Sequence, residues 1–301
     1  MVDKDRAARA VEIAEREPDA VLAVVGPTAS GKTELAVQVA EQIGGEIVSA
    51  DSVQVYRRFD IGSGKPSLEE QARACHHLID VLDPLDPMDA ARFADRARAA
   101  IDDIRSRGKR PIVCGGTFLW VKALLFGLAE APPASEAIRA AHRAVAEADG
   151  RPALHARLAT IDPASAARLH PNDLIRVSRA LEVHELTGEP MSAWQARHGF
   201  ATERLRAHLV GIAVEPEELT RRITARVHGW LASGWVDEVR TLVAEGFGDA
   251  RAMGSVGYRE VRRCVDDPIS YDELEILIVR STRIFARRQR TWLHHASVTW
   301  L

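Results

Sequence analysis

The chain has 301 residues, 46% hydrophobic and 28% charged, with a formal net charge of −3 at pH 7, a balance typical of a globular protein with a sizeable core. No run of 18 or more apolar residues occurs, which excludes a transmembrane helix, and the charged first 20 residues lack the apolar stretch of a signal peptide, so we expect a cytoplasmic protein with no membrane partner. Three isolated cysteines without a CxxC pair suit a reducing compartment and argue against structural zinc.

The first part of the chain alternates predicted strands with predicted helices. Residues 1–19 form an N-terminal extension that we expect to carry a loosely attached helix, ended by Pro18. After it, short β-branched apolar runs predict buried strands, and apolar residues at helical spacing predict helices. The predicted strands are 21–25, 46–50, 77–81 and 111–114, and the predicted helices are 32–43 and 89–107. This alternation implies a parallel sheet with right-handed crossovers, flanked by helices.

The pattern changes after residue 130. Residues 131–204 contain Ala-rich helical segments and turns such as His170-Pro171, with no good strand, and we interpret them as a helical insertion domain. A strand at 209–214 then returns to the sheet, followed by helices at 217–231, 236–245 and 271–294 and a final strand at 298–301. The core of the fold would therefore consist of residues 20–130 and 205–301.

A phosphate-binding motif lies between the first predicted strand and the first predicted helix of the core. Its eight residues match G-x-x-x-x-G-K-[ST] at every fixed position: Gly26, Pro27, Thr28, Ala29, Ser30, Gly31, Lys32 and Thr33. The glycines let backbone N–H groups converge on phosphate oxygens, and the helix N-terminus adds partial positive charge. Lys32 can reach the terminal phosphates, and the Thr33 hydroxyl can bind Mg²⁺. We therefore expect an α/β fold with a P-loop NTPase-like core.

This P-loop does not by itself predict ATP hydrolysis. NTPases of the motor and switch classes hold Mg²⁺ with a second acidic residue after an apolar strand. Here the strand at 111–114 ends in Gly115-Gly116-Thr117, and no Asn-Lys-x-Asp base-reading motif occurs. The loop is therefore expected to bind the diphosphate of a substrate, although a small-molecule kinase that binds ATP in the same loop stays open.

Asp51 follows the second predicted strand, at the edge of the sheet where ligands of open α/β sheets bind. Its carboxylate could act as a general base near the P-loop, or it could only cap the following turn, and position alone does not decide between the two. Gln54 comes three residues later, and a glutamine can pair with the edge of an adenine through two hydrogen bonds.

A stripe of arginines lies on the last predicted helix. Arg280, Arg283, Arg287 and Arg290 are spaced by three and four residues, so they share one face. Such a stripe can follow a nucleic-acid backbone, or it can be a solvated face. Residues 276–301 contain no acidic partner, which favours phosphate contact even though the net charge of the chain is slightly negative.

Further motifs occur in order along residues 21–293. They are Asp51-Ser52-Val53-Gln54-Val55-Tyr56, Asp60-Ile61-Gly62 with Lys65-Pro66, Gly115-Gly116-Thr117, His170-Pro171-Asn172-Asp173, Arg179-Ala180-Leu181-Glu182-Val183, Gly257-Tyr258-Arg259, Thr282-Arg283, Arg288-Gln289 and Thr291-Trp292. Together with the P-loop, they resemble the tRNA dimethylallyltransferases, also called IPP transferases. Eukaryotic members carry an additional zinc finger after this core, so the chain resembles the bacterial form.

The resemblance implies transfer of the dimethylallyl group from dimethylallyl diphosphate to the N6 amine of the adenosine 3′ of the anticodon. The acceptors would be tRNAs that read codons beginning with U, and diphosphate would be released. The P-loop would hold the diphosphate, with Mg²⁺ at Thr33, while Lys32 and Arg226 would stabilise the leaving group. Asp51 would accept the proton from the amine, and Thr117 would lie where donor and acceptor meet.

The resemblance also implies which residues contact tRNA. The insertion would grip the anticodon stem-loop, and the adenine would be flipped out of its stack into a channel of a monomeric enzyme. The residues implied in these contacts are Asp51, Ser52, Val53, Gln54, Thr117, Arg139, Ile175, Arg176, Val177, Ser178, Arg179, Gly257, Tyr258, Arg259, Arg283 and Arg287.

Some positions depart from the usual pattern of the family. The chain has Ser63-Gly64 where Thr-Ala is usual, Trp120 in place of tyrosine, Arg287 in place of lysine, and His294 in place of a basic residue. None of these departures removes a residue that is assigned to chemistry, but Trp120 affects the expected shape of the donor pocket.

Three other functions compete with this interpretation. An isopentenyltransferase acting on free ATP, ADP or AMP would need neither the insertion nor the arginine stripe. A small-molecule kinase would use the P-loop for ATP. A non-catalytic RNA-binding protein with a degenerate P-loop is disfavoured by the intact Lys32, Thr33 and Asp51.

Overall fold

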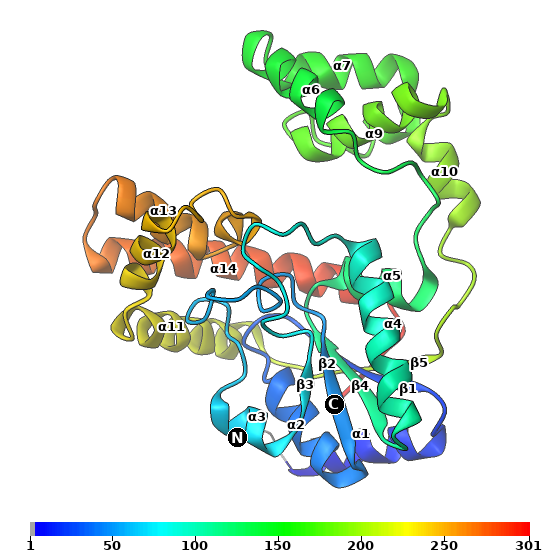
Figure 1. Ribbon diagram of the computed structural model, residues 1–301, viewed down its shortest axis with the longest axis vertical. Helices are drawn as coiled ribbons and strands as arrows, with labels where there is room; N and C mark the ends of the chain where they lie inside the picture. The colour runs from blue at the N-terminus through cyan, green and yellow to red at the C-terminus, as the bar shows by residue number, and fades with distance from the viewer. Residues whose placement is uncertain (1–3) are drawn as a thin grey trace. The chain divides into compact units, whose positions relative to one another are not determined.

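A six-stranded, all-parallel sheet organises the structure, a computed structural model that describes residues 4–301 (Figure 1). The strand order is β3-β2-β4-β1-β5-β6, and every neighbouring pair is parallel. The strands are β1 Val21–Val25, β2 Gly45–Ser49, β3 His76–His77, β4 Arg110–Gly115, β5 Ala207–Gly211 and β6 Val298–Trp300. All of β1 is buried, because helices cover both faces of a parallel sheet. The expected α/β fold with a parallel sheet is confirmed.

The chain divides into two compact units. The core unit consists of Met1–Leu125 and Glu203–Leu301, and the helical unit is Phe126–Thr202. The core unit contains α1 Lys4–Arg16, α2 Lys32–Ile43, α3 Leu68–Arg73, α4 Ala90–Ser106, α5 Phe118–Phe126 (which ends at the boundary), α11 Pro216–Ala232, α12 Trp235–Ala244, the 3₁₀ turn η1 Arg251–Gly254, α13 Tyr258–Asp266 and α14 Tyr271–Leu293. The helical unit contains α6 Glu136–Ala148, α7 Arg151–Ile161, α8 Pro163–Ala166, α9 Leu174–Thr187 and α10 Met191–His198. No helix within residues 4–301 is long and apolar enough to cross a membrane.

Three segments with candidate functional residues lie together at the C-terminal ends of the strands. Because the strands are parallel, the segments that follow β1, β2 and β4 leave the sheet at the same edge. They are the P-loop, the segment that begins at Asp51, and the turn Gly116-Thr117. At Gly115 a Cβ atom would lie 2.2 Å from the carbonyl oxygen of Ala50, so a side chain there would push β4 away from β2. Glycine at this position brings the two strand ends into close contact.

The N-terminal helix is more firmly attached than the sequence suggested. Ala7, Ala10 and Ala14 of α1 are buried in the same apolar cluster as Val39 and Ala40 of α2. Small side chains at a spacing of three and four residues let two helices approach closely. The expectation of a loosely attached helix was therefore wrong: the three buried alanines face the core, and the exposed positions include the charged residues Asp5, Arg9, Glu12, Glu15 and Arg16.

Several other elements differ from the prediction. The third strand covers only His76–His77, and the chain continues past it with a single bridge between Tyr56 and Leu82. Helices α3, α5 and α13 were not predicted. Most of α5 is buried, so its run of apolar residues has no helical period to detect.

The helical unit has its own small apolar core. Leu154 and Leu158 of α7 pack on Val177 and Leu181 of α9. The unit begins five residues before, and ends two residues before, the insertion expected at 131–204.

Candidate active site

The P-loop is shaped to present backbone N–H groups. Ala29 and Gly31 have positive φ angles of 64° and 94°, and Gly31 leads directly into α2. The first N–H groups of any α-helix lack an intrahelical partner, so those of Lys32 and Thr33 are available to an anion. Alternating left-handed residues and a helix N-terminus together form a concave anion site.

Lys32 lies in a protein environment that lowers the pKa of its amine by burial. The nearby negative charge of Asp51 acts in the opposite direction, and the positive charge of Arg226 adds to the lowering. The negative charge of a bound diphosphate would offset the desolvation of the Lys32 ammonium group and favour its charged form. The same effects indicate that Lys32, Asp51 and Arg226 are close enough to interact.

Asp51 has two distinct carboxylate oxygens. Oδ1 accepts hydrogen bonds from the backbone N–H of Val53 at 2.9 Å and of Gln54 at 3.3 Å, which caps the turn after β2. Oδ2 has no hydrogen-bond partner within residues 4–301. The expected cap of the turn is therefore confirmed, while the role of Asp51 as a general base stays a prediction, for which Oδ2 is the oxygen without a partner in the described part of the chain.

Thr117 connects the turn after β4 to the loop after β2. Its Oγ1 accepts a hydrogen bond from the backbone N–H of Ser52 at 3.1 Å, and its own backbone N–H donates to the oxygen of Ala50 at 3.2 Å. The two strand ends are thereby held at a fixed separation beside the P-loop.

A pocket of about 540 Å³ joins these groups. Lys32, Asp51, Thr117 and Arg226, the four residues expected to be catalytic, all line it. Its wall also contains Thr28, Ala29, Gly31, Thr33, Ser52, Val53, Gln54, Ser63, Gly64, Lys65, Trp230, Trp235, Val256, Phe285 and Gln289. We refer to it as the P-loop pocket. Trp120 is not among its lining residues and stacks on Phe93 instead, with ring centroids 4.6 Å apart.

Gln289 belongs to the motif Arg288-Gln289, for which no role was predicted, and it lies in the wall of the P-loop pocket. Its side chain is 6% exposed. Oε1 accepts a hydrogen bond from the backbone N–H of Thr28 at 2.8 Å, and Nε2 donates to the backbone oxygen of Gly116 at 2.9 Å. One side chain of α14 thus ties the P-loop to the turn after β4. The sequence feature that could have indicated a role for Gln289 is its position between two arginines, on the same helical face as Thr282 and Phe285.

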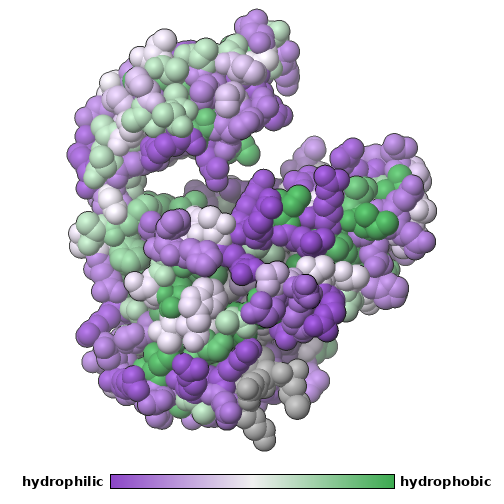
Figure 2. Space-filling model, turned by 180° about the vertical axis from the view of Figure 1, so that it is seen from behind, coloured by the Kyte–Doolittle hydropathy of each residue, from purple (hydrophilic) through white to green (hydrophobic). Residues whose placement is uncertain are grey.

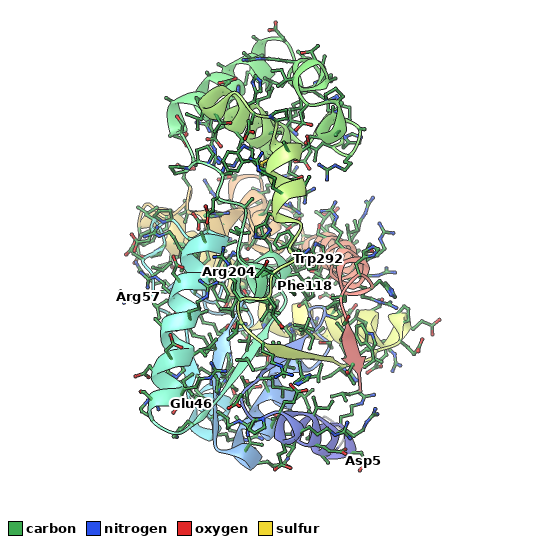
Figure 3. All side chains as sticks on the ribbon, turned by 90° about the vertical axis from the view of Figure 1, so that its right-hand side faces the viewer. Asp5, Glu46, Arg57, Phe118, Arg204 and Trp292 are labelled. Atoms are coloured by element: carbon green, nitrogen blue, oxygen red, sulfur yellow. The ribbon has the colours of Figure 1, made fainter. Side chains whose placement is uncertain are left out.

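Aromatic stacking supports the same junction. Phe118, the first residue of α5, and Trp292, near the end of α14, lie side by side with ring centroids 5.6 Å apart and an interplanar angle of 15° (Figure 3). The stack fixes the end of α14 next to the turn that carries Thr117.

Gln54 does not have the free amide that was expected. Its Nε2 donates to the backbone oxygen of Gly64 at 2.8 Å, and its Oε1 accepts from the hydroxyl of Ser49 at 3.0 Å. In this structure the amide holds the loop at Ser63-Gly64 in place, and the expected pairing of Gln54 with an adenine edge stays a prediction.

Two of the residues expected to contact tRNA are core residues. Tyr258 is 0% exposed and donates its hydroxyl hydrogen bond to Glu238, and Val177 is 1% exposed. Neither side chain is exposed in this structure, and the expected contacts of these two residues with tRNA stay predictions. Ser178 is also buried, with its hydroxyl bonded to His142 at 2.9 Å.

The arginines of the helical unit differ in how they are engaged. Arg139 and Arg179 form ion pairs with Glu182, which is 0% exposed. Ile175 and Arg176, in contrast, are strongly exposed at the start of α9. The exposed pair is the better candidate for a contact, whereas the first two arginines compensate a buried charge.

Arg283 and Arg287 lie on a face of α14 other than the one that carries Gln289. With Arg280 and Arg290 they line a groove of about 430 Å³ against α11, whose floor includes Leu219 and Ile223. We call it the arginine groove. None of the four side chains forms an ion pair within residues 4–301. Figure 2 shows hydrophilic and hydrophobic side chains interspersed over the part of the core unit formed by α11–α14.

The remaining implied contacts lie in two segments. Arg259 is exposed and paired with Glu260 at 2.7 Å, and Gly257, the N-cap residue of α13, has a positive φ of 92°. Ser52 is exposed and Val53 half-buried in the loop after β2.

The residues at Thr33 fit a magnesium ion. The hydroxyl of Thr33 has no hydrogen-bond partner within residues 4–301, and Asp51 Oδ2 is a second free oxygen in the wall of the same pocket. Mg²⁺ in proteins takes few protein oxygens and completes its shell with water and substrate phosphates. A hydroxyl at the first turn of a helix beside an anion site supplies that chemistry.

A second cluster with metal-binding residue types is better explained as an ion-pair network. Ligand atoms of Glu46, Cys75 and His77 lie within 4.8 Å of one another. Glu46 accepts a hydrogen bond from Arg107 at 2.7 Å and forms an ion pair with Lys109 at 3.3 Å. The hydrogen bonds from Arg107 hold the pKa of its carboxyl far below the usual range. Since Glu46 lies at the start of β2, it is at the opposite end of the strand from Asp51 (Figure 3).

The arrangement is that of an α/β transferase with a phosphate-binding loop at the carboxyl edge of a parallel sheet. Comparison with known proteins identifies the family: a model described as IPP transferase matches residues 54–296, and one described as isopentenyl transferase matches residues 19–85. The chain belongs to the IPP transferase family, as its motifs suggested.

The relatives agree with this assignment. The tRNA dimethylallyltransferase of Sorangium cellulosum is 62% identical over 289 residues, covering 96% of this chain and 92% of that protein. That of Geobacter sulfurreducens is 49% identical over 280 residues, covering 92% and 90%.

Solved structures are similar along most of the chain. The tRNA isopentenylpyrophosphate transferase of Bacillus halodurans is 36% identical with a TM-score of 0.68, covering 94% of this chain and 89% of that one. A eukaryotic dimethylallyltransferase acting on tRNA is 25% identical with a TM-score of 0.74, covering 94% and 73%.

Proposed function

We propose that this protein transfers the dimethylallyl group of dimethylallyl diphosphate to the N6 amine of the adenosine 3′ of the anticodon, in tRNAs that read codons beginning with U. The observation that carries the proposal is the P-loop pocket, which brings Lys32 and Arg226 together with the carboxylate of Asp51 in one wall. Cations suit a diphosphate, and a carboxylate suits an amine that must lose a proton. The names of the relatives support the same reaction.

The donor reacts by breaking the bond between its allylic carbon and the diphosphate oxygen. Negative charge then grows on the diphosphate. Lys32, Arg226 and the N-terminus of α2 are positioned before the reaction to stabilise that charge, which is where preorganised groups contribute most. Mg²⁺, held by Thr33, would add positive charge to the same oxygens.

The acceptor amine becomes cationic as its nitrogen bonds to the allylic carbon. Asp51 removes the extra proton through Oδ2, while Oδ1 stays bound to the amides of Val53 and Gln54. The loop hydrogen bonds keep the carboxylate from turning away between catalytic cycles. Thr117 holds the backbone of Ser52 at the same point.

We further propose that the anticodon stem-loop binds to exposed residues of both units. In the helical unit these are Ile175 and Arg176, and in the core unit Arg283 and Arg287. The guanidinium groups of Arg283 and Arg287 form no ion pair within residues 4–301, which suits phosphate contacts, and Arg176 is strongly exposed and pairs only with Asp173 of its own helix turn. Lys32, Asp51, Thr117 and Arg226 line a single pocket without a residue from a second copy, and the enzyme is proposed to act as a monomer, in the cytoplasm where tRNA is found.

Asp51→Asn tests the proposal. With radiolabelled dimethylallyl diphosphate and unmodified tRNA, we expect turnover to fall ~10²–10⁴-fold while tRNA binding is nearly unchanged. Asp95→Asn is the matched control, because Asp95 is exposed on α4 away from the pocket. Near-normal turnover of Asp51→Asn would refute the base role.

The same assay separates the competing functions. Label on AMP but not on tRNA would identify an enzyme that acts on free nucleotides. Phosphate transfer from ATP without any prenyl transfer would identify a kinase, and binding of tRNA without either reaction would identify a non-catalytic RNA-binding protein.

A further inference from the structure

One wall of the P-loop pocket is aromatic, and part of it is immobile. Trp235 is fully buried between two glycines of distant segments. A Cβ atom at Gly62 would lie 2.0 Å from the indole ring, and one at Gly257 would lie 2.4 Å from it. Because the ring fills both spaces left by the missing side chains, Trp235 is a fixed base for what packs on it.

Trp230 packs against the ring of Trp235. The two indole rings meet edge to face, with centroids 5.4 Å apart and an interplanar angle of 78°, which is a favourable aromatic geometry. Trp230 lies in the wall of the P-loop pocket, half-buried, so its exposed edge borders the cavity.

The position of Trp230 in the pocket follows from Arg226. The two residues are four apart on α11, and the guanidinium carbon lies 5.6 Å from the centroid of the indole. Arg226 is also close enough to Lys32 for their charges to interact. The indole therefore lies next to the end of the pocket that receives the diphosphate.

Gly64 provides the space that Trp230 occupies. Its φ is +62°, and a Cβ atom there would lie 3.2 Å from Cζ2 of Trp230. The backbone of Gly64 is itself fixed by the hydrogen bond from Gln54 Nε2 at 2.8 Å. The indole thus has contacts with Trp235, Gly64 and Arg226, which hold it on the sides that do not face the pocket.

We infer that Trp230 closes the donor end of the P-loop pocket and restricts the donor to a five-carbon chain. The inference rests on the proposed function and deepens it by naming the residue that sets donor size. An apolar chain attached to the diphosphate passes the indole, and a second isoprene unit would occupy the space that the indole fills.

The experiment compares dimethylallyl diphosphate with its ten-carbon homologue, geranyl diphosphate, as donors to the same tRNA. For Trp230→Ala and Trp230→Leu, we expect kcat/KM for the ten-carbon donor to rise ~10–100-fold relative to kcat/KM for the five-carbon donor, a range typical of hydrophobic pockets that discriminate by size. Trp230→Phe keeps a ring over Arg226 and should shift the ratio less. Trp300→Leu, an exposed tryptophan of β6, should not shift it at all.

Two results would overturn the inference. One is an unchanged donor ratio in folded Trp230→Ala and Trp230→Leu that still transfer the five-carbon group. The other is a change confined to the KM for tRNA, which would place Trp230 on the acceptor side. Failure of the unaltered protein to transfer the five-carbon group would instead refute the proposed function itself.

Discussion

Gln289→Leu removes the side chain that joins the P-loop to the turn after β4. Two hydrogen bonds, of 2.8 and 2.9 Å, are lost from a residue that is 6% exposed. The N–H of Thr28 and the carbonyl of Gly116 then lack a protein partner, because the leucine side chain has no polar atom. An unsatisfied buried group costs about 1–3 kcal/mol, and Thr28 is only half-buried, so we expect a loss of about 2–4 kcal/mol in the free energy of unfolding.

Gln289→Glu separates the structural effect from the catalytic one. The carboxylate can still accept the hydrogen bond from Thr28, but it replaces the donor to Gly116 and adds negative charge to the wall that contains Lys32. Repulsion of a diphosphate should raise the KM for dimethylallyl diphosphate by ~10-fold or more, as expected for a like charge in a partly desolvated site, while the KM for tRNA changes little.

Urea unfolding and initial rates with each substrate varied in turn measure both effects. Gln71→Leu is the control, since Gln71 also donates to a backbone oxygen, that of Pro66 at 2.8 Å, but is exposed and outside the pocket. If Gln289→Leu is as stable as Gln71→Leu, and Gln289→Glu binds both substrates normally, the assigned role of Gln289 is wrong.

Two further predictions concern buried carboxylates. Hydrogen bonds from Arg107 hold the pKa of Glu46 well below its ordinary 4.5, so the ionised carboxylate stabilises the folded protein above pH 4.5, and this contribution is lost as the pH falls further. The difference in unfolding free energy between the unaltered protein and Glu46→Gln should therefore become smaller between pH 7 and pH 3 in urea titrations. A difference that stays constant would contradict this. Glu182→Ala leaves Arg139 and Arg179 without their partner and should destabilise the helical unit by about 2–3 kcal/mol, less than for a fully buried pair because the arginines keep contact with solvent. Hydrogen exchange should speed up across residues 126–202, and unchanged exchange there would argue against a stabilising role for the pair.

The sheet and the P-loop were predictable because their signals are local. A continuous run such as Val21–Val25 predicts a buried parallel strand, and the P-loop pattern combines glycines, a lysine and a hydroxyl within eight residues. Apart from Lys122, α5 is apolar throughout, so its sequence carries no clear helical period that would have predicted a buried helix.

The rest of the site depends on contacts between distant residues. Gln289 meets Thr28 across 261 positions, and no spacing rule reports such a contact. Burial was not visible in the sequence either: Tyr258, in the motif Gly257-Tyr258-Arg259, and Val177, in the segment 175–179, were both expected to contact tRNA, and both side chains are buried. Burial is a tertiary property.

The interruption of the core unit has a consequence for synthesis on the ribosome. β1 is flanked by β4 and β5, and β5 begins only at Ala207, after the whole helical unit has been made. The helical unit is one continuous segment and can fold from local contacts as soon as it emerges, whereas one side of β1 must wait. Gln289 arrives still later, within the last helix. During most of translation, the nascent chain therefore contains the P-loop but not yet Gln289, which holds the P-loop through Thr28. A prematurely terminated product would have the P-loop sequence but no assembled active site.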